Sequence, residues 1–381
     1  MGRLSSLDTM RGLIIVVMAI DHARGFIAKN HPGEWWGRAL PDYQGDVLAF
    51  LTRLVTHICA PGFFFLMGAG MALLAASRAK AGWSTGRIIR FLVLRGLALI
   101  VLAQIFENGA AAFSAANQTR SMNYRVFPPG IDGSIPSVLL IVLYGLGSAM
   151  ILGSTLWRLR PAWLIAAAVA CELVVQWLVP PASQVNVRFH PLLRLLVFSG
   201  QSGWLLVVYP TLAWLPCTLL GMAFGTSLLE DRDRALRRLG LAGALFLGLF
   251  VVLRAAGGFG NITPSPGGWI GFFNLVKYPP SLTFLLLTLG VDFLLLAAID
   301  RWRIGDRTWS RPLLVFGAVP FFFYVTHLWL YAAIGRFFPA GIPLPWMYPF
   351  WLLGLVLLYL PCRWYGAFKQ RRRPESWFRL L

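Results

Sequence analysis

The chain has few charged residues, and acidic ones are the scarcest. Only 13% of its 381 residues are charged, and 15 acidic residues stand against 34 lysines and arginines. Hydrophobic residues make up 57% of the chain, and its mean hydropathy is +0.67. These values lie outside the range of soluble domains. They exclude a soluble globular fold and predict an all-α polytopic membrane protein.

Cysteine is also scarce, and the sequence has no CxxC or CxxCH motif. The four cysteines lie within or at the ends of hydrophobic stretches, where free cysteines behave as small hydrophobic residues. We therefore expect no bound metal. The basic excess includes no nucleic-acid-binding motif and no separate basic domain, so nucleic acid is not expected as a partner. The cysteines are Cys59, Cys171, Cys217 and Cys362.

Long hydrophobic stretches are abundant. A transmembrane helix needs roughly 17 to 25 apolar residues, and ten stretches meet this requirement. The first is not a cleaved signal peptide, because its apolar core runs directly into Asp21 and His22 without a small-x-small cleavage site. The ten predicted spans are residues 10–29, 47–76, 88–106, 135–157, 162–180, 205–228, 239–256, 279–299, 312–336 and 347–366.

Basic residues gather in alternate connections between these spans. If the chain crosses the membrane ten times, these connections all face one side, and the positive-inside rule assigns that side to the cytoplasm. We therefore expect both termini in the cytoplasm and a single transmembrane domain over residues 1–381. The basic connections are Arg78 to Arg90, Arg158 and Arg160, Arg232 to Arg238, Arg301 to Arg311, and the tail from Lys369 to Arg373.

Small residues within two spans predict close helix packing. Gly221 and Gly225 form a GxxxG pair, and Gly68 and Gly70 bring small residues into the second span. Such residues let the backbones of neighbouring transmembrane helices approach each other.

The first span carries ionisable residues on one helical face. Arg11 and His22 are eleven residues apart, so they differ by about 20° around the helix axis and by roughly 16 Å along it. Asp8 is placed to pair with Arg11 as an i, i+3 neighbour. An ionisable group at membrane depth costs several kcal/mol, so Asp21 and His22 are functional candidates. A structural hydrogen bond between helices is the alternative.

Other polar residues are predicted at the depth of His22. His57 lies four residues before Pro61, which should interrupt the second span. The third span ends with Gln104, Glu107 and Asn108, and the ninth contains His327. The histidines and the acids Asp21 and Glu107 are therefore expected to converge as an acid–base cluster, the arrangement that proton transfer requires.

The cytoplasmic half has a separate group of arginines. Arg95 lies about seven residues inside the third span, where it must reach the interface or meet an anion. Together with Arg11, Arg87 and Arg90 it could form a phosphate-binding vestibule. For Arg87 and Arg90, an ordinary positive-inside role is the alternative.

Several segments, in order, resemble one enzyme family. The segments "SLDTMRGLIIVVMAIDH", "THICAPGFFFLMGAG", "YPTLAWL", "KYPPSLTFLLLTLG" and "FGAVPFFFYVTHLWL" are similar to bacterial members of the heparan-alpha-glucosaminide N-acetyltransferase-like family of transmembrane acyltransferases. The resemblance covers nearly the whole chain. The spacing of Arg11 and His22 also resembles that of the acyltransferase-3 membrane proteins. A multi-pass protein of the bacterial inner membrane is implied.

The resemblance leaves three histidines as candidates for the catalytic residue. The acyltransferase-3 pattern points to His22. The lysosomal enzyme of the first family has an asparagine at that place and its catalytic histidine in the loop before the second span, where this chain has His31. The same enzyme has an aspartate where this chain has His57. The choice among His22, His57 and His31 therefore stays open at this point.

The resemblance implies acetyl-CoA as co-substrate. Its phosphates would lie near Arg11 and Arg95, with Asp8 and Arg90 in the same group. His22 would act as general base or as nucleophile through an acetyl-imidazole. We expect Glu107 to orient the imidazole better than Asp21, which points about 100° away from His22 on the same helix.

The acceptor would be a sugar, a glycan or a small molecule that arrives at the outer face. We expect it to contact His327, Lys277, Tyr278 and aromatic residues of the outer loops, although an interfacial aromatic belt is the alternative. Those residues are Trp35, Trp36, Tyr124, Trp204, Trp269 and Trp346.

Two other functions fit the intramembrane polar residues. A proton-coupled transporter of a small molecule or lipid-linked glycan would use a similar polar path, and would favour broken helices in both halves of the chain. We expect only one such break, at Pro61. A haem protein would use His22 with His57 or His327 as axial ligands. Membrane lipids are partners in every case, and homodimerisation stays open.

Overall fold

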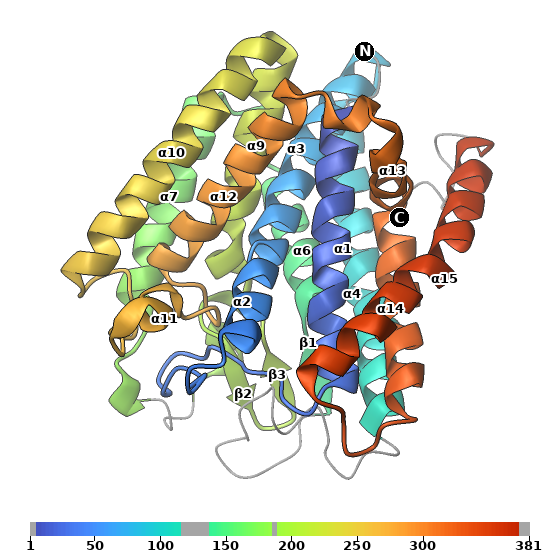
Figure 1. Cartoon of the computed structure of the whole chain (residues 1–381). Helices are drawn as coiled ribbons and strands as arrows, with labels where there is room; N and C mark the ends of the chain where they lie inside the picture. Colours follow the sequence, from blue (N-terminus) through green and yellow to red (C-terminus); the bar gives the residue numbers. More distant parts are fainter. Residues whose placement is uncertain (1–4, 116–136, 185–188, 373–381) are drawn as a thin grey trace.

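Helices dominate the structure. The computed structural model describes residues 5–115, 137–184 and 189–372. The long helices lie side by side and run alternately up and down in the view of Figure 1. The helices are α1 (Ser5–Ile27), α2 (Val47–Thr56), α3 (Cys59–Lys80), α4 (Thr85–Ala115), α6 (Val142–Gly153), α7 (Pro161–Leu178), α8 (Pro191–Leu196), α9 (Thr211–Glu230), α10 (Arg232–Ala256), α11 (Gly268–Phe273), α12 (Leu282–Arg301), α13 (Arg311–Ala318), α14 (Pro320–Gly335) and α15 (Leu344–Gln370).

Seven helices within the described residues are long and apolar enough to cross a membrane, and the bent pair α13–α14 gives an eighth. The seven are Val47–Lys80, which combines α2 and α3, and then α4, α7, α9, α10, α12 and α15. The two other predicted spans correspond to α1, which carries four charged residues, and to α6, which has only 12 residues. The polytopic helical fold is therefore as predicted, while two of the ten predicted spans differ from ordinary apolar helices.

Two helices are broken. The first break was predicted from Pro61, and the second was not. Helix α2 ends at Thr56 and α3 begins at Cys59, with Pro61 in its first turn. The expectation of no broken helix in the second half is wrong, because Thr308–Ala318 and α14 are bent by 88°. The cause is local: Val319 precedes Pro320 and is excluded from the α-helical region, with φ −134° and ψ 52°.

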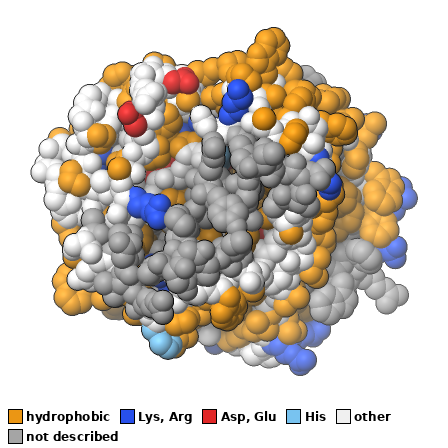
Figure 2. Space-filling model, turned by 90° about the horizontal axis from the view of Figure 1, so that it is seen from below, with side chains coloured by type: hydrophobic (Ala, Val, Ile, Leu, Met, Phe, Trp, Pro, Cys, Tyr) orange, Lys and Arg blue, Asp and Glu red, His pale blue; other side chains and the backbone are white. Residues whose placement is uncertain are grey.

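A small sheet closes the lower end of the bundle. Its strands β1 (Val138–Leu140), β2 (Gly200–Ser202) and β3 (Leu205–Val207) have the order β1-β3-β2. The β1–β3 pair is parallel and the β2–β3 pair is antiparallel. The all-α prediction did not include this sheet. Seen from below, the described side chains of this end are mainly hydrophobic around the rim, and lysines and arginines are scattered rather than grouped (Figure 2).

Close packing of α3 against α9 forms the centre of the bundle, as the small residues predicted. A Cβ atom on Gly68 would collide with the Thr218 carbonyl oxygen, and one on Gly221 would collide with that of Phe65. Gly225 is similarly close to Ala69. A Cβ on Gly70 would meet no atom within 4 Å, so this glycine is not part of the contact.

Candidate active site

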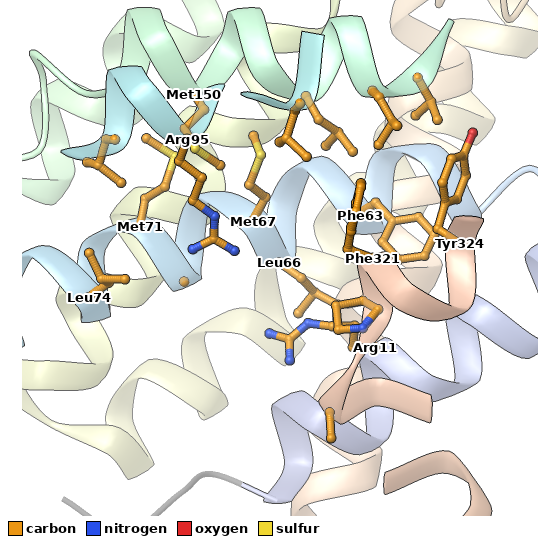
Figure 3. Close-up of a pocket in the computed structure, with 18 of the residues that line it drawn as sticks. Arg11, Phe63, Leu66, Met67, Met71, Leu74, Arg95, Met150, Phe321 and Tyr324 are labelled. Carbon is orange, nitrogen blue, oxygen red and sulfur yellow. The ribbon is translucent and has the colours of Figure 1, made fainter. Parts of the chain in front are cut away.

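A cavity of about 320 Å³ opens between helices in the half of the bundle that contains Arg11. Its volume lies in the range of about 300 to 1,000 Å³ that ligand pockets occupy. Arg11 from α1 and Arg95 from α4 place their guanidinium groups in one part of it, with Tyr324 at the other end (Figure 3). Lys369 of α15 adds a third cation. Between these groups the wall is apolar and rich in methionine. We call this the inner cavity.

The cations of the inner cavity differ in their partners. Arg11 donates through Nη1 to Asp8 Oδ1 at 2.7 Å, the predicted i, i+3 pair, and to the Gly317 carbonyl oxygen at 3.2 Å. The Nε atom of Arg95 is buried and has no hydrogen-bond partner among the described residues. A guanidinium group in this situation is available to an anion.

Two members of the predicted vestibule lie elsewhere. Arg90 is exposed and does not line the inner cavity, so its expected contact with an anion stays a prediction. The guanidinium of Arg87 stacks on the Trp83 ring, 4.0 Å from its centroid. Both arginines are in the first two turns of α4, nearer the end of the bundle than Arg95. Lys369 lines the inner cavity instead, although its sequence position had indicated only a role in topology.

A second cavity of about 100 Å³ lies in the other half of the bundle, and we call it the outer cavity. Its ionisable residues are Asp21, His22, His31 and Glu107, so much of the predicted acid–base cluster does converge. Ile141 follows β1 and Val208 follows β3, which shows how the small sheet forms one wall. The complete lining is Asp21, His22, Gly25, Phe26, His31, Glu107, Ala111, Ile141, Val208, Tyr209, Tyr278, Tyr324 and Leu328.

Tyr324 lines both cavities. Its hydroxyl group donates to Glu107 Oε1 at 2.5 Å, and the same oxygen accepts the Leu143 backbone N–H at 3.2 Å. The other oxygen of Glu107 is buried without a hydrogen-bond partner in the described part of the chain. Tyr324, whose hydroxyl group is held by a buried carboxyl group, is therefore the one described residue that lines both cavities.

His22 contacts a histidine rather than an acid. Its Nδ1 atom lies 2.6 Å from Nε2 of His327, whose own Nδ1 lies 2.8 Å from the Phe323 carbonyl oxygen. The expectation that Glu107 orients His22 is therefore wrong, because the carboxyl group of Glu107 pairs with Tyr324 and Leu143. His327 is fully buried and does not line the outer cavity, which also corrects its predicted role in binding the acceptor.

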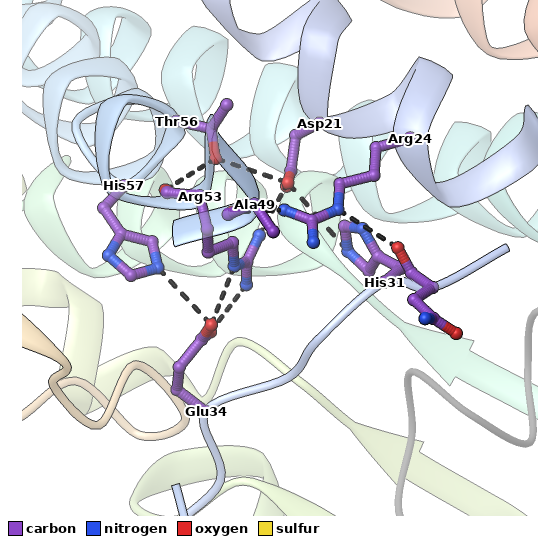
Figure 4. Close-up of polar contacts among 9 residues, drawn as sticks. Asp21, Arg24, His31, Glu34, Ala49, Arg53, Thr56 and His57 are labelled. Carbon is purple, nitrogen blue, oxygen red and sulfur yellow. Dashed lines mark hydrogen bonds and ion pairs between the residues drawn. The ribbon is translucent and has the colours of Figure 1, made fainter. Parts of the chain in front are cut away.

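An ion cluster includes Asp21, which lines the outer cavity (Figure 4). Arg53 of α2 donates to both carboxylate oxygens of Glu34, at 2.8 and 2.6 Å, and to Asp21 Oδ1 at 2.6 Å. Burial acts to raise the pKa of Glu34, but Arg53 outweighs it and holds this pKa well below its usual range. Glu34 is therefore ionised. The cluster joins α1, α2 and the loop between them.

His57 belongs to this cluster and not to either cavity. Its Nε2 atom lies 3.6 Å from Glu34 Oε1, and its ring packs against Phe284. It is 3% exposed and lines neither the inner nor the outer cavity. The prediction that His57 lies beside His22 in the proton-transfer cluster is therefore wrong. The break at His57 turns its side chain toward the loop that contains Glu34.

His31 also lines the outer cavity. Its Nε2 atom lies 3.9 Å from Asp21 Oδ1. Burial lowers the pKa of His31 to about 3, although the charge of Asp21 opposes the change. The side chain is therefore neutral near pH 7. Its position makes it a second imidazole within reach of a molecule in the outer cavity.

Most of the aromatic residues expected to bind the acceptor lie elsewhere. Trp35 is buried against the Tyr278 ring at 4.9 Å, and Lys277 is buried with its Nζ 5.2 Å from the centroid of that ring. Only Tyr278 of these three reaches the outer cavity. Trp36 is also buried, Trp204, Trp269 and Trp346 are exposed, and Tyr124 lies outside the described residues.

The direct contact of His22 with His327 leaves no space for an iron atom between these two rings. Among the described residues there is also no group of three or more histidine, cysteine, aspartate or glutamate side chains that could hold a metal ion.

The sequence matches the family model described as "Heparan-alpha-glucosaminide N-acetyltransferase, catalytic" over residues 3–253. The chain belongs to this family. The match confirms the resemblance seen in the sequence and identifies a membrane-bound acetyltransferase. A search of curated proteins gave no match. The matched region of this N-acetyltransferase family member includes α1 to α9 and nearly all of α10, and thus both walls contributed by α1 and α4.

Proposed function

We propose that the protein transfers an acetyl group from cytoplasmic acetyl-CoA to a sugar or other small acceptor at the outer face of the membrane. The observation that carries this proposal is that Tyr324 lines both cavities. A donor in the inner cavity and an acceptor in the outer cavity would meet at this one side chain. Holding two reactants at such a junction turns a bimolecular reaction into a nearly unimolecular one.

The donor end of this proposal rests on charge and shape. Arg11, Arg95 and Lys369 supply three cations at the inner cavity, and guanidinium groups bind phosphate through paired hydrogen bonds. The apolar wall beyond them suits a pantetheine arm. Arg11 and His22 are separated by roughly 16 Å along α1. A thioester that follows α1 from the phosphates would therefore approach Tyr324 and His22.

In the transfer step, His22 takes the proton of the acceptor amine or hydroxyl group. The acceptor atom forms a bond to the thioester carbonyl carbon, the carbon–sulfur bond breaks, and CoA leaves as the thiolate. The imidazolium then returns the proton to the thiolate. Asp21 lies on the same cavity wall and supplies a negative charge near the imidazolium.

The orientation in the membrane is part of the proposal. We place the end of the bundle with Arg11, Arg95 and Lys369 in the cytoplasm, where acetyl-CoA is made. Ten crossings then include the charged α1 and the short α6, both termini are cytoplasmic, and residues 1–381 form one domain of the bacterial inner membrane. The basic connections support this orientation.

Replacement of His22 tests the proposal. Purified protein in nanodiscs is incubated with radiolabelled acetyl-CoA and glucosamine, the sugar named by the family, and CoA release is measured. We expect His22→Ala to lower the rate about 100-fold or more, because general base catalysis contributes about 10²- to 10⁴-fold. The exposed His190 provides the control, and His190→Ala should keep the full rate.

Each other outcome has a definite meaning. If His22→Ala keeps the wild-type rate, His22 is not the base. If His31→Ala or His57→Ala alone abolishes CoA release, the catalytic role moves to that residue. Label that stays on the wild-type protein would show an acetyl-imidazole intermediate. If the wild type releases no CoA and binds no acetyl-CoA, the acyltransferase proposal is wrong.

A further inference from the structure

The hydrogen bonds of His327 fix the position of its proton. A carbonyl oxygen only accepts hydrogen bonds, so Nδ1 of His327, which lies 2.8 Å from the Phe323 carbonyl oxygen, must carry a hydrogen atom. The ring is fully buried in α14, and its nitrogens face backbone groups of α14 and the ring of His22. A buried cation without a carboxylate partner is costly at this depth. His327 is therefore neutral, with a lone pair on Nε2.

This assignment determines the tautomer of His22. The lone pair on Nε2 of His327 faces Nδ1 of His22 at 2.6 Å, so His22 must donate from Nδ1. In a neutral imidazole only one nitrogen carries hydrogen. Nε2 of His22 is then a free lone pair, and it makes no hydrogen bond within the described part of the chain. Because the opposite edge of the ring is held by His327, Nε2 is the nitrogen available on the cavity side.

We propose that His327 is a positioning residue that holds His22 as the Nδ1–H tautomer, so that Nε2 accepts the proton of the acceptor. This inference rests on the proposed function for its chemical purpose, but not for its geometry. The usual tautomer of a free histidine side chain carries its proton on Nε2, and that form has no lone pair to offer to the outer cavity. The Phe323 carbonyl group thus fixes the tautomer of His327, and His327 in turn fixes the tautomer of His22.

The tautomers are measurable without any turnover. The chain has five histidines, so nitrogen NMR on ¹⁵N-histidine-labelled protein in lipid bilayers resolves a small set of signals. Spectra of His22→Gln and His327→Gln assign the pair. We expect protonated Nδ1 and unprotonated Nε2 in both residues, with a coupling across the shared hydrogen bond. A His22 signal with the proton on Nε2 overturns the proposal.

Kinetics test the consequence for catalysis. His327→Phe keeps a ring but has no acceptor for the Nδ1–H of His22, whereas His327→Gln places an amide oxygen near the former Nε2. We expect kcat to fall about 100-fold in His327→Phe and about 10-fold in His327→Gln, within the range of general base catalysis. The KM for acetyl-CoA should change less than about twofold in both, because the donor binds in the inner cavity.

A neighbouring residue of the same helix serves as control. Thr326 donates to the Phe322 carbonyl oxygen within α14, and Thr326→Val should keep kcat unchanged. Equal losses in His327→Phe and His327→Gln, or full activity in His327→Phe, contradict the proposal. If the wild type transfers no acetyl group, the proposed function fails, while the NMR result still decides the tautomer.

Discussion

At the scale of single residues, Arg53 determines where the charge of the outer cavity lies. It is 1% exposed and bonds two carboxylates, Glu34 from the loop and Asp21 from α1. A buried ion pair adds little stability by itself, but removing one partner costs about 3 to 5 kcal/mol. Arg53 therefore acts as a fixed link. It holds the Asp21 carboxylate at the cavity wall beside His22.

Arg95 carries the clearest prediction for donor binding. We expect Arg95→Gln to raise the KM for acetyl-CoA about 10- to 100-fold, because a hydrogen bond to a charged group contributes about 1.5 to 3 kcal/mol. The value of kcat should change little, since Arg95 lies far from the acyl carbon in the proposed complex. Initial rates of CoA release over a range of acetyl-CoA concentrations measure both constants.

The matched control is Arg238, an exposed arginine of α10. Arg238→Gln removes the same charge from the same side of the bundle and should leave the KM unchanged. Equal increases in the two variants would show a general effect of net charge and would remove Arg95 from the donor site.

The sequence indicates the residues of α1 better than those that meet them. Helical periodicity alone puts Arg11 and His22 on one face and pairs Asp8 with Arg11. Long-range partners leave weaker signals. Arg53 is a charged residue within a predicted span, so its depth in the membrane could have marked it as functional. Tyr324 is three residues before His327, so helical spacing could have placed it on the same face. Glu34 lies in a loop, where no pattern distinguishes it from a solvated acid.

At the scale of helices, the α3–α9 contact depends on glycine. We expect Gly221→Ala to destabilise the protein by about 1 to 3 kcal/mol, because the added methyl group would meet the Phe65 backbone and overpacking costs this much. A lower midpoint of thermal unfolding in detergent, followed by circular dichroism, measures the effect.

A glycine outside any contact isolates the packing effect. A Cβ on Gly248 of α10 would meet no atom within 4 Å. Gly248→Ala should therefore keep or slightly raise the unfolding midpoint, because alanine favours the helix by about 1 kcal/mol over glycine. A loss of stability equal to that of Gly221→Ala would contradict the importance of the contact.

The sequence predicts helices better than their breaks. Hydropathy locates the seven long apolar segments, the bent pair, α1 and the short α6, because length and apolar content decide whether a helix can cross a bilayer. The break at Val319 was missed although Pro320 marks it. Pro320 forces Val319 out of the α-helical region, but a proline in a transmembrane helix causes anything from a slight kink to a sharp bend, so the sequence alone did not give the angle. The three-residue strands are too short to leave a pattern.

At the scale of the whole molecule, the proposed orientation assigns each connection to one side. Ser84 lies between α3 and α4, and Ser265 lies between α10 and α12; both are exposed. We expect an impermeant maleimide to label Ser265→Cys in intact cells, and to label Ser84→Cys only after the membrane is opened. The four native cysteines lie within helices and provide the background. The reverse pattern would invert the orientation.

The position of Tyr324, in the lining of both cavities, also bears on the electrical insulation of the membrane. A potential of about 100 mV does about 2.3 kcal/mol of work on each elementary charge that crosses the bilayer. An enzyme with a continuous water-filled channel would let ions cross the membrane and would dissipate that potential. In the proposed reaction the donor and the acceptor meet at Tyr324, which lines both cavities, so only an opening wide enough for an acetyl group is needed between them. Under the proposed function, a molecule at the outer face would then be acetylated while the membrane stays sealed against ions.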